Sequence, residues 1–286
     1  MRVCGLRREH GSIRSHPLPA GSMHLDARPP PMKDVFATTS HRPWPLPTRP
    51  WVMRQTWHDL LFAHWPVDAA ALRPLLPEGL HVDTFEGQAW LGVVPFGMRD
   101  VFPRGTLAIP GLSAFLELNV RTYVTDSEGP DAKPGVWFFS LDAASRVAVR
   151  VARGWFHLPY FDADMRMDVV GDAVRYHSRR THRSAPPADL RADYAATGPV
   201  RRAQPGTLEH WLTERYCLYT TGRGGRLVRG EIHHLPWPLQ PAEAAFDVNT
   251  MADAAGLSLP SVEPVTHFAK SIDVAVWALE GIQPAT

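Results

Sequence analysis

Hydrophobic and polar residues alternate along several stretches of this chain, and a period of two residues predicts β-strands. The clearest case is residues 117–124, where leucine, valine and threonine side chains share one face. The other face carries four polar side chains, Glu117, Asn119, Arg121 and Tyr123. This row either faces solvent or lines a cavity, and the pattern alone leaves both readings open.

Similar patterns recur along the chain. We expect further strands over residues 81–85, 88–96, 136–142, 147–156, 165–170, 173–182, 214–221, 226–234 and 271–279. Short helices are expected after Asp68 and Thr207, which are suited to N-capping, and from Asn249 to Gly256. Many strands, few short helices and no strand–helix alternation predict an α+β fold built mainly from antiparallel strands.

Residues 1–50 show no sustained period and are crowded with Pro, Arg, His and Ser, so we expect a disordered or extended leader. Met23 or Met32 are alternative starts. No internal repeat or linker follows, and residues 51–286 are therefore predicted to form a single domain.

Composition excludes several classes of function. The net charge of +1 gives no electrostatic case for nucleic-acid binding. Two cysteines cannot make a disulfide framework, and no apolar run approaches the ~20 residues that span a bilayer. The start of the chain lacks the apolar core of a secretory signal. We expect a cytoplasmic protein without nucleic-acid or membrane partners, and leave a homo-oligomer open.

Six blocks of sequence carry a family resemblance: residues 57–66, 75–83, 89–96, 117–123, 135–142 and 153–160. Together they resemble the YqjF-like family, a domain of unknown function grouped with the acetoacetate-decarboxylase-like superfamily. The resemblance covers roughly residues 51–280. It implies one curved, mostly antiparallel sheet, rolled into a cone or barrel around an internal cavity, with helices packed outside.

The superfamily's best-known reaction uses a lysine that forms a Schiff base with the substrate. The resemblance aligns Arg153 and Pro159 with an arginine and a proline that precede a pair of lysines in acetoacetate decarboxylase. At the two lysine positions this chain has Tyr160 and Phe161. Its only lysines are Lys33, Lys133 and Lys270. We therefore expect no Schiff-base chemistry at that site, while the role of Lys270 stays open.

Residues 136–142 bear on the orientation of the polar row. Aromatic residues stand on both faces of that expected strand, with Phe138, Ser140 and Asp142 on one side, so both faces are predicted to be covered. A closed barrel achieves this. If Glu117 and Arg121 are both buried, we expect them to form an ion pair with each other, because an unpaired buried charge costs several kcal/mol.

The favoured function is binding of a small organic carboxylate in an apolar cavity. The alternative is a lysine-independent lyase or proton-transfer enzyme, with Glu117 as acid or base, Arg121 or Arg153 as anion anchor and Tyr160 as hydrogen-bond donor. The remaining candidate ligand-binding residues are Asn119, Tyr123 and Ser140. A third class, an interaction module, would need an exposed apolar patch.

Histidines are abundant, but their spacing does not fit a metal site. His58 and His64 flank an apolar run, and the adjacent His233 and His234 would point to opposite faces of a strand. Cys217 has no partner residues that would activate a nucleophile. No metal and no cofactor are expected.

Overall fold

The structure is a computed structural model that describes residues 35–106, 113–129 and 131–282. One sheet connects its strands, which are β1 (Met53–Val67), β2 (His81–Val82), β3 (Ala89–Pro103), β4 (Phe115–Thr125), β5 (Gly135–Ala143), β6 (Tyr160–Val170), β7 (Ala173–Arg180), β8 (Asp189–Ala196), β9 (Cys217–Thr221), β10 (Leu227–His233), β11 (Leu239–Asn249), β12 (Val265–Val276) and β13 (Glu280–Gly281). The helices are α2 (Ala69–Leu72), α3 (Arg146–Trp155) and α4 (Leu208–Thr213), with 3-10 turns η1 (Arg73–Leu75), η2 (Arg223–Gly225) and η3 (Asp253–Ala255).

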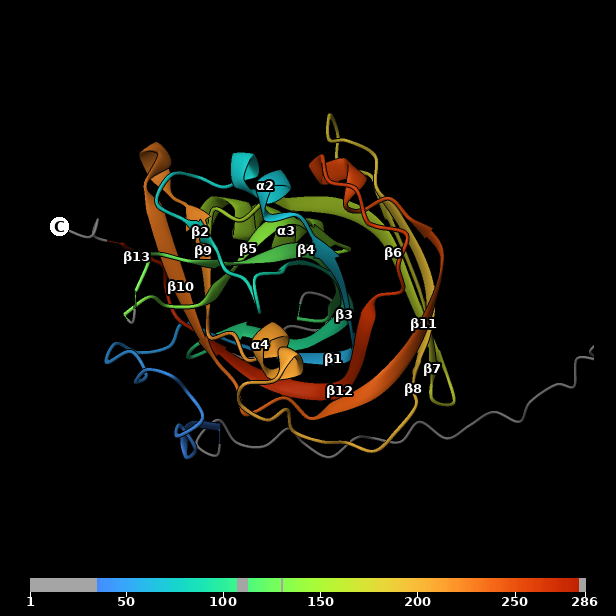
Figure 1. Cartoon of the computed structure of the whole chain (residues 1–286), viewed down its shortest axis with the longest axis horizontal. Helices are drawn as coiled ribbons and strands as arrows, with labels where there is room; N and C mark the ends of the chain where they lie inside the picture. The colour runs from blue at the N-terminus through green and yellow to red at the C-terminus, as the bar shows by residue number, and fades with distance from the viewer. Residues whose placement is uncertain (1–34, 107–112, 130, 283–286) are drawn as a thin grey trace, which may run out of the picture. The chain divides into compact units, whose positions relative to one another are not determined.

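The sheet closes into a nine-stranded ring. Neighbouring strands follow the order β5–β6–β7–β8–β11–β12–β1–β3–β4, and the pairing of β4 with β5 completes the circle (Figure 1). Every pairing in this ring is antiparallel except β5 with β6, which is parallel. The closed, curved and mainly antiparallel sheet with few short helices confirms the predicted fold class.

A second ring branches from the first. On the edge of β5 that faces away from β4, residues 136 and 137 pair with β9, and residues 141–143 pair with β6. Strand β12 likewise pairs with β11 at one end and with β10 at the other. Because β9 pairs with β10, the second ring consists of β12, β1, β3, β4, β5, β9 and β10. A Cβ at Gly135 would lie 2.8 Å from the carbonyl oxygen of Cys217, so the contact between β5 and β9 requires glycine there.

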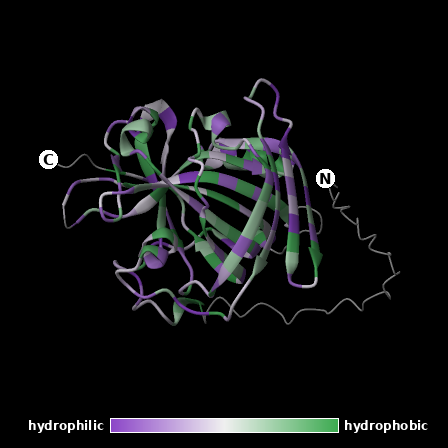
Figure 2. Ribbon diagram, turned by 45° about the vertical axis from the view of Figure 1, so that its right-hand side comes forward, coloured by the Kyte–Doolittle hydropathy of each residue, from purple (hydrophilic) through white to green (hydrophobic). Residues whose placement is uncertain are grey.

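The alternating pattern of β4 places its two faces in different surroundings. Leu118 and Val120 are fully buried and belong to the same apolar core as Tyr176 of β7 and Leu190 of β8. Figure 2 shows the alternation of hydrophobic and hydrophilic residues along neighbouring strands of the sheet. The opposite face of β4 is buried as well, since Glu117 is only 2% exposed. Both faces of this strand are therefore covered.

A β-bulge changes the faces expected for β5. Val120 pairs with Ser140 but Arg121 pairs with Phe138, so one extra residue of β5 is accommodated between them. Phe138 and Leu141 consequently share the face of Arg121, and Phe139 joins the core on the other side. The strict alternation assumed for residues 136–142 is wrong at this point, because a bulge leaves no mark in a run of aromatic residues.

Residues 147–156 were expected to form a strand, and this prediction is wrong. They form helix α3, whose N-cap Ser145 accepts a hydrogen bond from the backbone N–H of Ala148 at 3.3 Å. The alternating valines favour a strand locally, but β5 and β6 are parallel. A parallel pair needs a crossover connection, and α3 lies in that crossover.

Other local signals agree with the structure. The side chain of Asp68 caps α2, that of Thr207 caps α4, and Gly256 follows η3 in the left-handed conformation. Strands β1, β8 and β11 were not predicted. The positive φ of Asp59 interrupts the alternation of β1, and β11 contains three alanines, a glutamate and a proline, which are poor strand formers.

Part of the expected leader packs against the sheet. Residues 1–34 lie outside the described part of the chain, but Val35 is buried and its carbonyl oxygen lies 2.9 Å from Nε2 of His233. Arg42 forms a 3.1 Å ion pair with Glu231 of β10. The folded unit thus includes residues before the predicted boundary at residue 51. In the described residues no helix is long and apolar enough to cross a bilayer.

Candidate functional site

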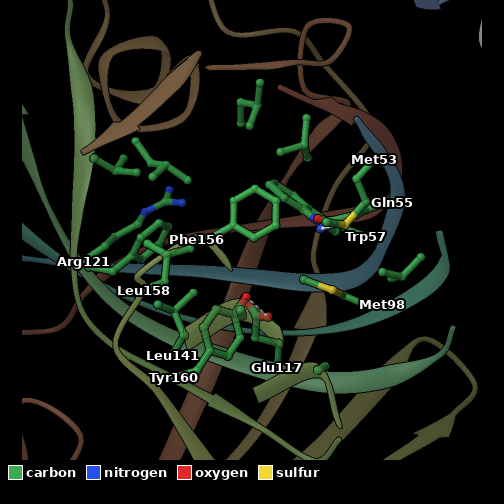
Figure 3. Close-up of a pocket in the computed structure, with 18 of the residues that line it drawn as sticks. Met53, Gln55, Trp57, Met98, Glu117, Arg121, Leu141, Phe156, Leu158 and Tyr160 are labelled. Atoms are coloured by element: carbon green, nitrogen blue, oxygen red, sulfur yellow. Dashed lines mark hydrogen bonds between the residues drawn. The ribbon is translucent and has the colours of Figure 1, made fainter. Parts of the chain in front are cut away.

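A cavity of about 180 Å³ lies within the second ring. All seven strands of this ring contribute to its wall, with Met53, Met98, Glu117, Val136, Cys217, Ile232 and Val276 among the lining residues. Helix α3 and the segment after it add Ala152, Phe156 and Leu158 (Figure 3). Glu117 and Arg121 of the predicted polar row on β4 therefore face a cavity and not solvent.

The carboxyl group of Glu117 is one polar feature of this mostly apolar wall. The phenol of Tyr160, the first residue of β6, donates a hydrogen bond to Oε2 of Glu117 at 2.7 Å. Burial raises the pKa of Glu117 to about 8, although the bond from Tyr160 partly opposes this shift. Burial, together with the nearby carboxyl group, also raises the pKa of Tyr160. At pH 7 Glu117 is thus mainly a neutral acid.

Arg121 is the second polar feature, and among the described residues its guanidinium has no hydrogen-bond or ion-pair partner. The residue is 8% exposed and lines the cavity. Its Cζ lies 5.3 Å from the ring centre of Phe62 and 5.8 Å from that of Tyr123, so aromatic faces support the charge. Nε of Arg121 is buried without a partner. The expected ion pair with Glu117 does not form, because the two residues are four positions apart along one face of β4 and Glu117 bonds to Tyr160 instead.

The other polar residues of the wall are engaged within the protein. Arg215 forms a 2.6 Å ion pair with Asp83, Thr213 donates to the carbonyl oxygen of Glu209, and His234 lies within hydrogen-bond distance of the Leu235 carbonyl oxygen. Burial lowers the pKa of His234, which keeps its ring neutral. Arg121 therefore supplies a net positive charge to the cavity that no lining carboxylate balances.

Asn119 and Tyr123 stand on the same face of β4 as Arg121 but have different roles. Neither residue lines the cavity; Asn119 lies between Glu117 and Arg121, and its Oδ1 is buried without a partner. The hydroxyl of Tyr123 donates to the carbonyl oxygen of Leu212 at 2.9 Å and accepts from Nε2 of His64 at 2.6 Å. Burial holds the pKa of His64 well below its usual value, so the ring is neutral and orients Tyr123.

Two further candidate residues, like Asn119 and Tyr123, do not line the cavity. Ser140 pairs with Val120 and belongs to the opposite face of the sheet. Arg153, on α3, lines a separate pocket with Pro159 and Phe161, and its Nη1 donates to the Tyr160 carbonyl oxygen at 2.7 Å. Of the two arginines considered as anion anchors, only Arg121 reaches the cavity.

Several lining residues were not singled out from the sequence. Trp57 and Trp237 stack with ring centres 6.0 Å apart, and both line the cavity. Arg215 was also missed. A tryptophan is normally buried in any fold, so its presence carries no signal for a cavity until the tertiary neighbours are known.

The positions of the lysines and of possible metal ligands can be compared with the position of the cavity. No described lysine lines the cavity: Nζ of Lys270 bonds to Asp59 at 2.6 Å and Nζ of Lys133 bonds to Glu231 at 3.2 Å. Tyr160 and Phe161 occupy the start of β6, and Tyr160 reaches the cavity. Within the described part of the chain, no three His, Cys, Asp or Glu residues are grouped as metal ligands would be.

Comparison with solved structures agrees with the architecture. The enduracididine biosynthesis enzyme MppR complexed with pyruvate superposes with a TM-score of 0.55 at 14% identity, covering 83% of this chain and 93% of that one. Acetoacetate decarboxylase from Legionella pneumophila superposes with a TM-score of 0.54 at 14% identity, covering 85% and 93%. At these identities the likeness establishes an acetoacetate-decarboxylase-like fold.

Sequence comparison is more specific. Residues 54–273 match the family model DUF2071, described as "Uncharacterized conserved protein (COG2071)". The uncharacterized protein YqjF of Bacillus subtilis (strain 168) is 49% identical over 234 residues, which span 82% of this chain and 94% of that protein. The chain belongs to the YqjF-like DUF2071 family.

Proposed function

We propose that the cavity binds a small organic carboxylate and that Arg121 anchors it. The observation that carries this proposal is the guanidinium of Arg121, which lines an apolar cavity with no acidic partner among the described residues. A guanidinium presents parallel N–H donors that match the two oxygens of a carboxylate. Binding an anion there would compensate a charge that the folded protein leaves unbalanced.

Two further observations support this choice of ligand. The neutral state of Glu117 at pH 7 removes the one lining carboxylate that would repel an anion. A protein of the same fold, MppR, has been solved in complex with pyruvate, itself a small carboxylate. Because no described lysine lines the cavity, the proposed binding needs no covalent attachment.

Replacing Arg121 tests the proposal directly. We expect Arg121→Gln to weaken carboxylate binding roughly 30-fold or more, because the ligand's charge would be buried without its partner. The measurement is isothermal titration calorimetry with pyruvate, hexanoate and heptanoate at pH 7. Arg150→Gln removes an exposed arginine of α3 and is the matched control, with unchanged affinity expected. Equal carboxylate affinity of wild type and Arg121→Gln would refute the anchor.

The second candidate function is lysine-independent proton transfer on the same ligand class. It is favoured by the raised pKa of Glu117 and its contact with Tyr160. In its ionised form, which gains population as the pH approaches 8, Glu117 would take a proton from the carbon next to a ligand carbonyl and return it to the same carbon.

Deuterium exchange separates the enzyme from the binder. If Glu117 catalyses proton transfer, wild-type protein in D₂O should exchange the protons next to the carbonyl of pyruvate or 4-oxopentanoate faster than buffer does. The rate should rise with pH through about 8. We expect Glu117→Gln to abolish the exchange while the affinity persists, which proton NMR and calorimetry measure. Exchange no faster than in buffer would leave binding as the function.

A further inference from the structure

The cavity has two separate polar points on one strand. Glu117 and Arg121 are four residues apart on the same face of β4, which places their Cα atoms ~13 Å apart. Figure 3 shows the guanidinium of Arg121 and the bonded pair of Glu117 and Tyr160 at separate places around the cavity. A ligand that touches both must therefore be elongated.

The residues that line the cavity around these points are mainly apolar, and Asn119, which stands between them on β4, does not line it. Phe138 lies opposite Arg121 on β5, and Leu141 lies opposite Asn119. Phe156 and Leu158 line the cavity from the segment that follows α3. Such a wall has no hydrogen bonds to offer along the middle of a bound molecule and favours a hydrocarbon chain there.

The two ends differ in what they offer a ligand. Arg121 offers charged N–H donors. At the other end, Oε2 of Glu117 accepts the hydrogen bond from Tyr160, so the proton of the neutral carboxyl group is free for an outside acceptor. The second end is therefore suited to an uncharged oxygen that accepts one hydrogen bond.

We infer that the ligand is an elongated carboxylic acid with a carbonyl-type oxygen at its far end: the carboxylate binds Arg121, a hydrocarbon chain crosses the apolar wall, and the far oxygen accepts a hydrogen bond from Glu117. This inference rests on the proposed function and goes beyond it in fixing the length and second group of the ligand. Side chains on one face of a strand project roughly parallel to each other, so the polar ends of Glu117 and Arg121 are also on the order of 13 Å apart. Allowing about 2.8 Å for a hydrogen bond at each end leaves on the order of 7 Å between the ligand's two polar groups.

A series of methyl-ketone acids tests the length. The probes run from 3-oxobutanoate through 4-oxopentanoate, 5-oxohexanoate and 6-oxoheptanoate to 7-oxooctanoate, each compared by calorimetry with the straight-chain acid of equal carbon number. We expect the gain from the ketone to peak at 6-oxoheptanoate or 7-oxooctanoate. At the peak, the ketone acid should bind about 5- to 10-fold more tightly than its straight-chain counterpart, as for one net hydrogen bond.

Variants at Glu117 test the second contact. Glu117→Gln retains an N–H donor and should keep the ketone preference. Glu117→Leu combined with Tyr160→Phe removes both polar groups, and it should abolish the preference while heptanoate still binds. In wild-type protein, raising the pH above the pKa of Glu117, about 8, removes the donor, so the ratio of ketone-acid to straight-chain affinity should fall without any mutation.

The outcomes distinguish the two levels of the proposal. If carboxylates bind through Arg121 but show no length optimum and no ketone preference, the elongated ligand is refuted and the anchor stands. If Arg121→Gln leaves carboxylate affinity unchanged, the proposed function itself is refuted. A ketone preference that survives both the double substitution and the rise in pH would also overturn the contact with Glu117.

Discussion

Glu117→Gln is expected to remove a steep dependence of folding stability on pH between about 4.5 and 8. The pKa of Glu117 rises from 4.5 to about 8 on folding, chiefly because the carboxyl group is buried. Below pH 4.5 the group is protonated in both the folded and unfolded chains. Between the two pKa values the unfolded chain has released the proton that the folded chain retains, so wild-type stability falls as the pH rises.

The size of this effect follows from the linkage between proton binding and folding. Each pH unit in this range lowers the free energy of unfolding of the wild type by about 1.4 kcal/mol relative to Glu117→Gln. By pH 8 the difference reaches on the order of 5 kcal/mol in favour of the glutamine variant, and above pH 8 it stays constant.

Urea unfolding of both proteins from pH 4.5 to 9 measures this difference. Glu243→Gln replaces an exposed glutamate of β11 and is the control, with no comparable slope expected. Parallel stability curves for wild type and Glu117→Gln across the range would contradict a buried neutral carboxyl group at residue 117, and with it the donor role assigned to that group.

Arg180→Met is expected to lower the free energy of unfolding by about 3–5 kcal/mol, since it leaves the carboxyl group of Asp142 buried without its partner. Nη2 of Arg180 lies 2.6 Å from Oδ1 of Asp142, and both side chains are almost completely buried. Burial raises the pKa of Asp142 and the ion pair with Arg180 counters that shift, so removing Arg180 leaves the burial cost largely uncompensated.

A control on the same strand shares the chemistry but not the burial. Arg175 pairs with Asp193 at 3.1 Å, and their side chains are 74% and 57% exposed. Arg175→Met should leave the urea midpoint almost unchanged in the same experiment, because an exposed ion pair contributes little. A second check is Arg180→Met combined with Asp142→Leu, which should recover most of the stability. Equal losses for Arg180→Met and Arg175→Met would contradict the importance of burial.

These two buried acids show how similar sequence patterns reach different outcomes. Glu117 and Asp142 both lie in alternating stretches, and sequence cannot say which acid will meet an arginine. Asp142 pairs with the core residue Leu118 and so shares its face of the sheet, where it meets Arg180. Glu117 faces the cavity and meets Tyr160, 43 residues along the chain. Because both partners come from strands brought together by ring closure, only the folded sheet defines the charge state of each acid.

Helix α3 shows that a local pattern can also predict the wrong secondary structure. Val147, Val149 and Val151 alternate as a strand would, yet the parallel contact between β5 and β6 demands a crossover that the sequence does not reveal. The helical conformation affects the candidate site, because α3 contributes to the cavity wall while Arg153 on the same helix lines another pocket.

The sequence by itself determined the alternation of β4, most turns and helix caps, and the mainly antiparallel β-rich class. These features are local or are read residue by residue. The tertiary structure alone decided that Glu117 and Arg121 of β4 line a cavity, that Glu117 bonds to Tyr160, and that Arg121 stands without an acidic partner. The physical reason is that a period of two residues defines two faces, whereas the burial of either face depends on which distant strands close the ring around it.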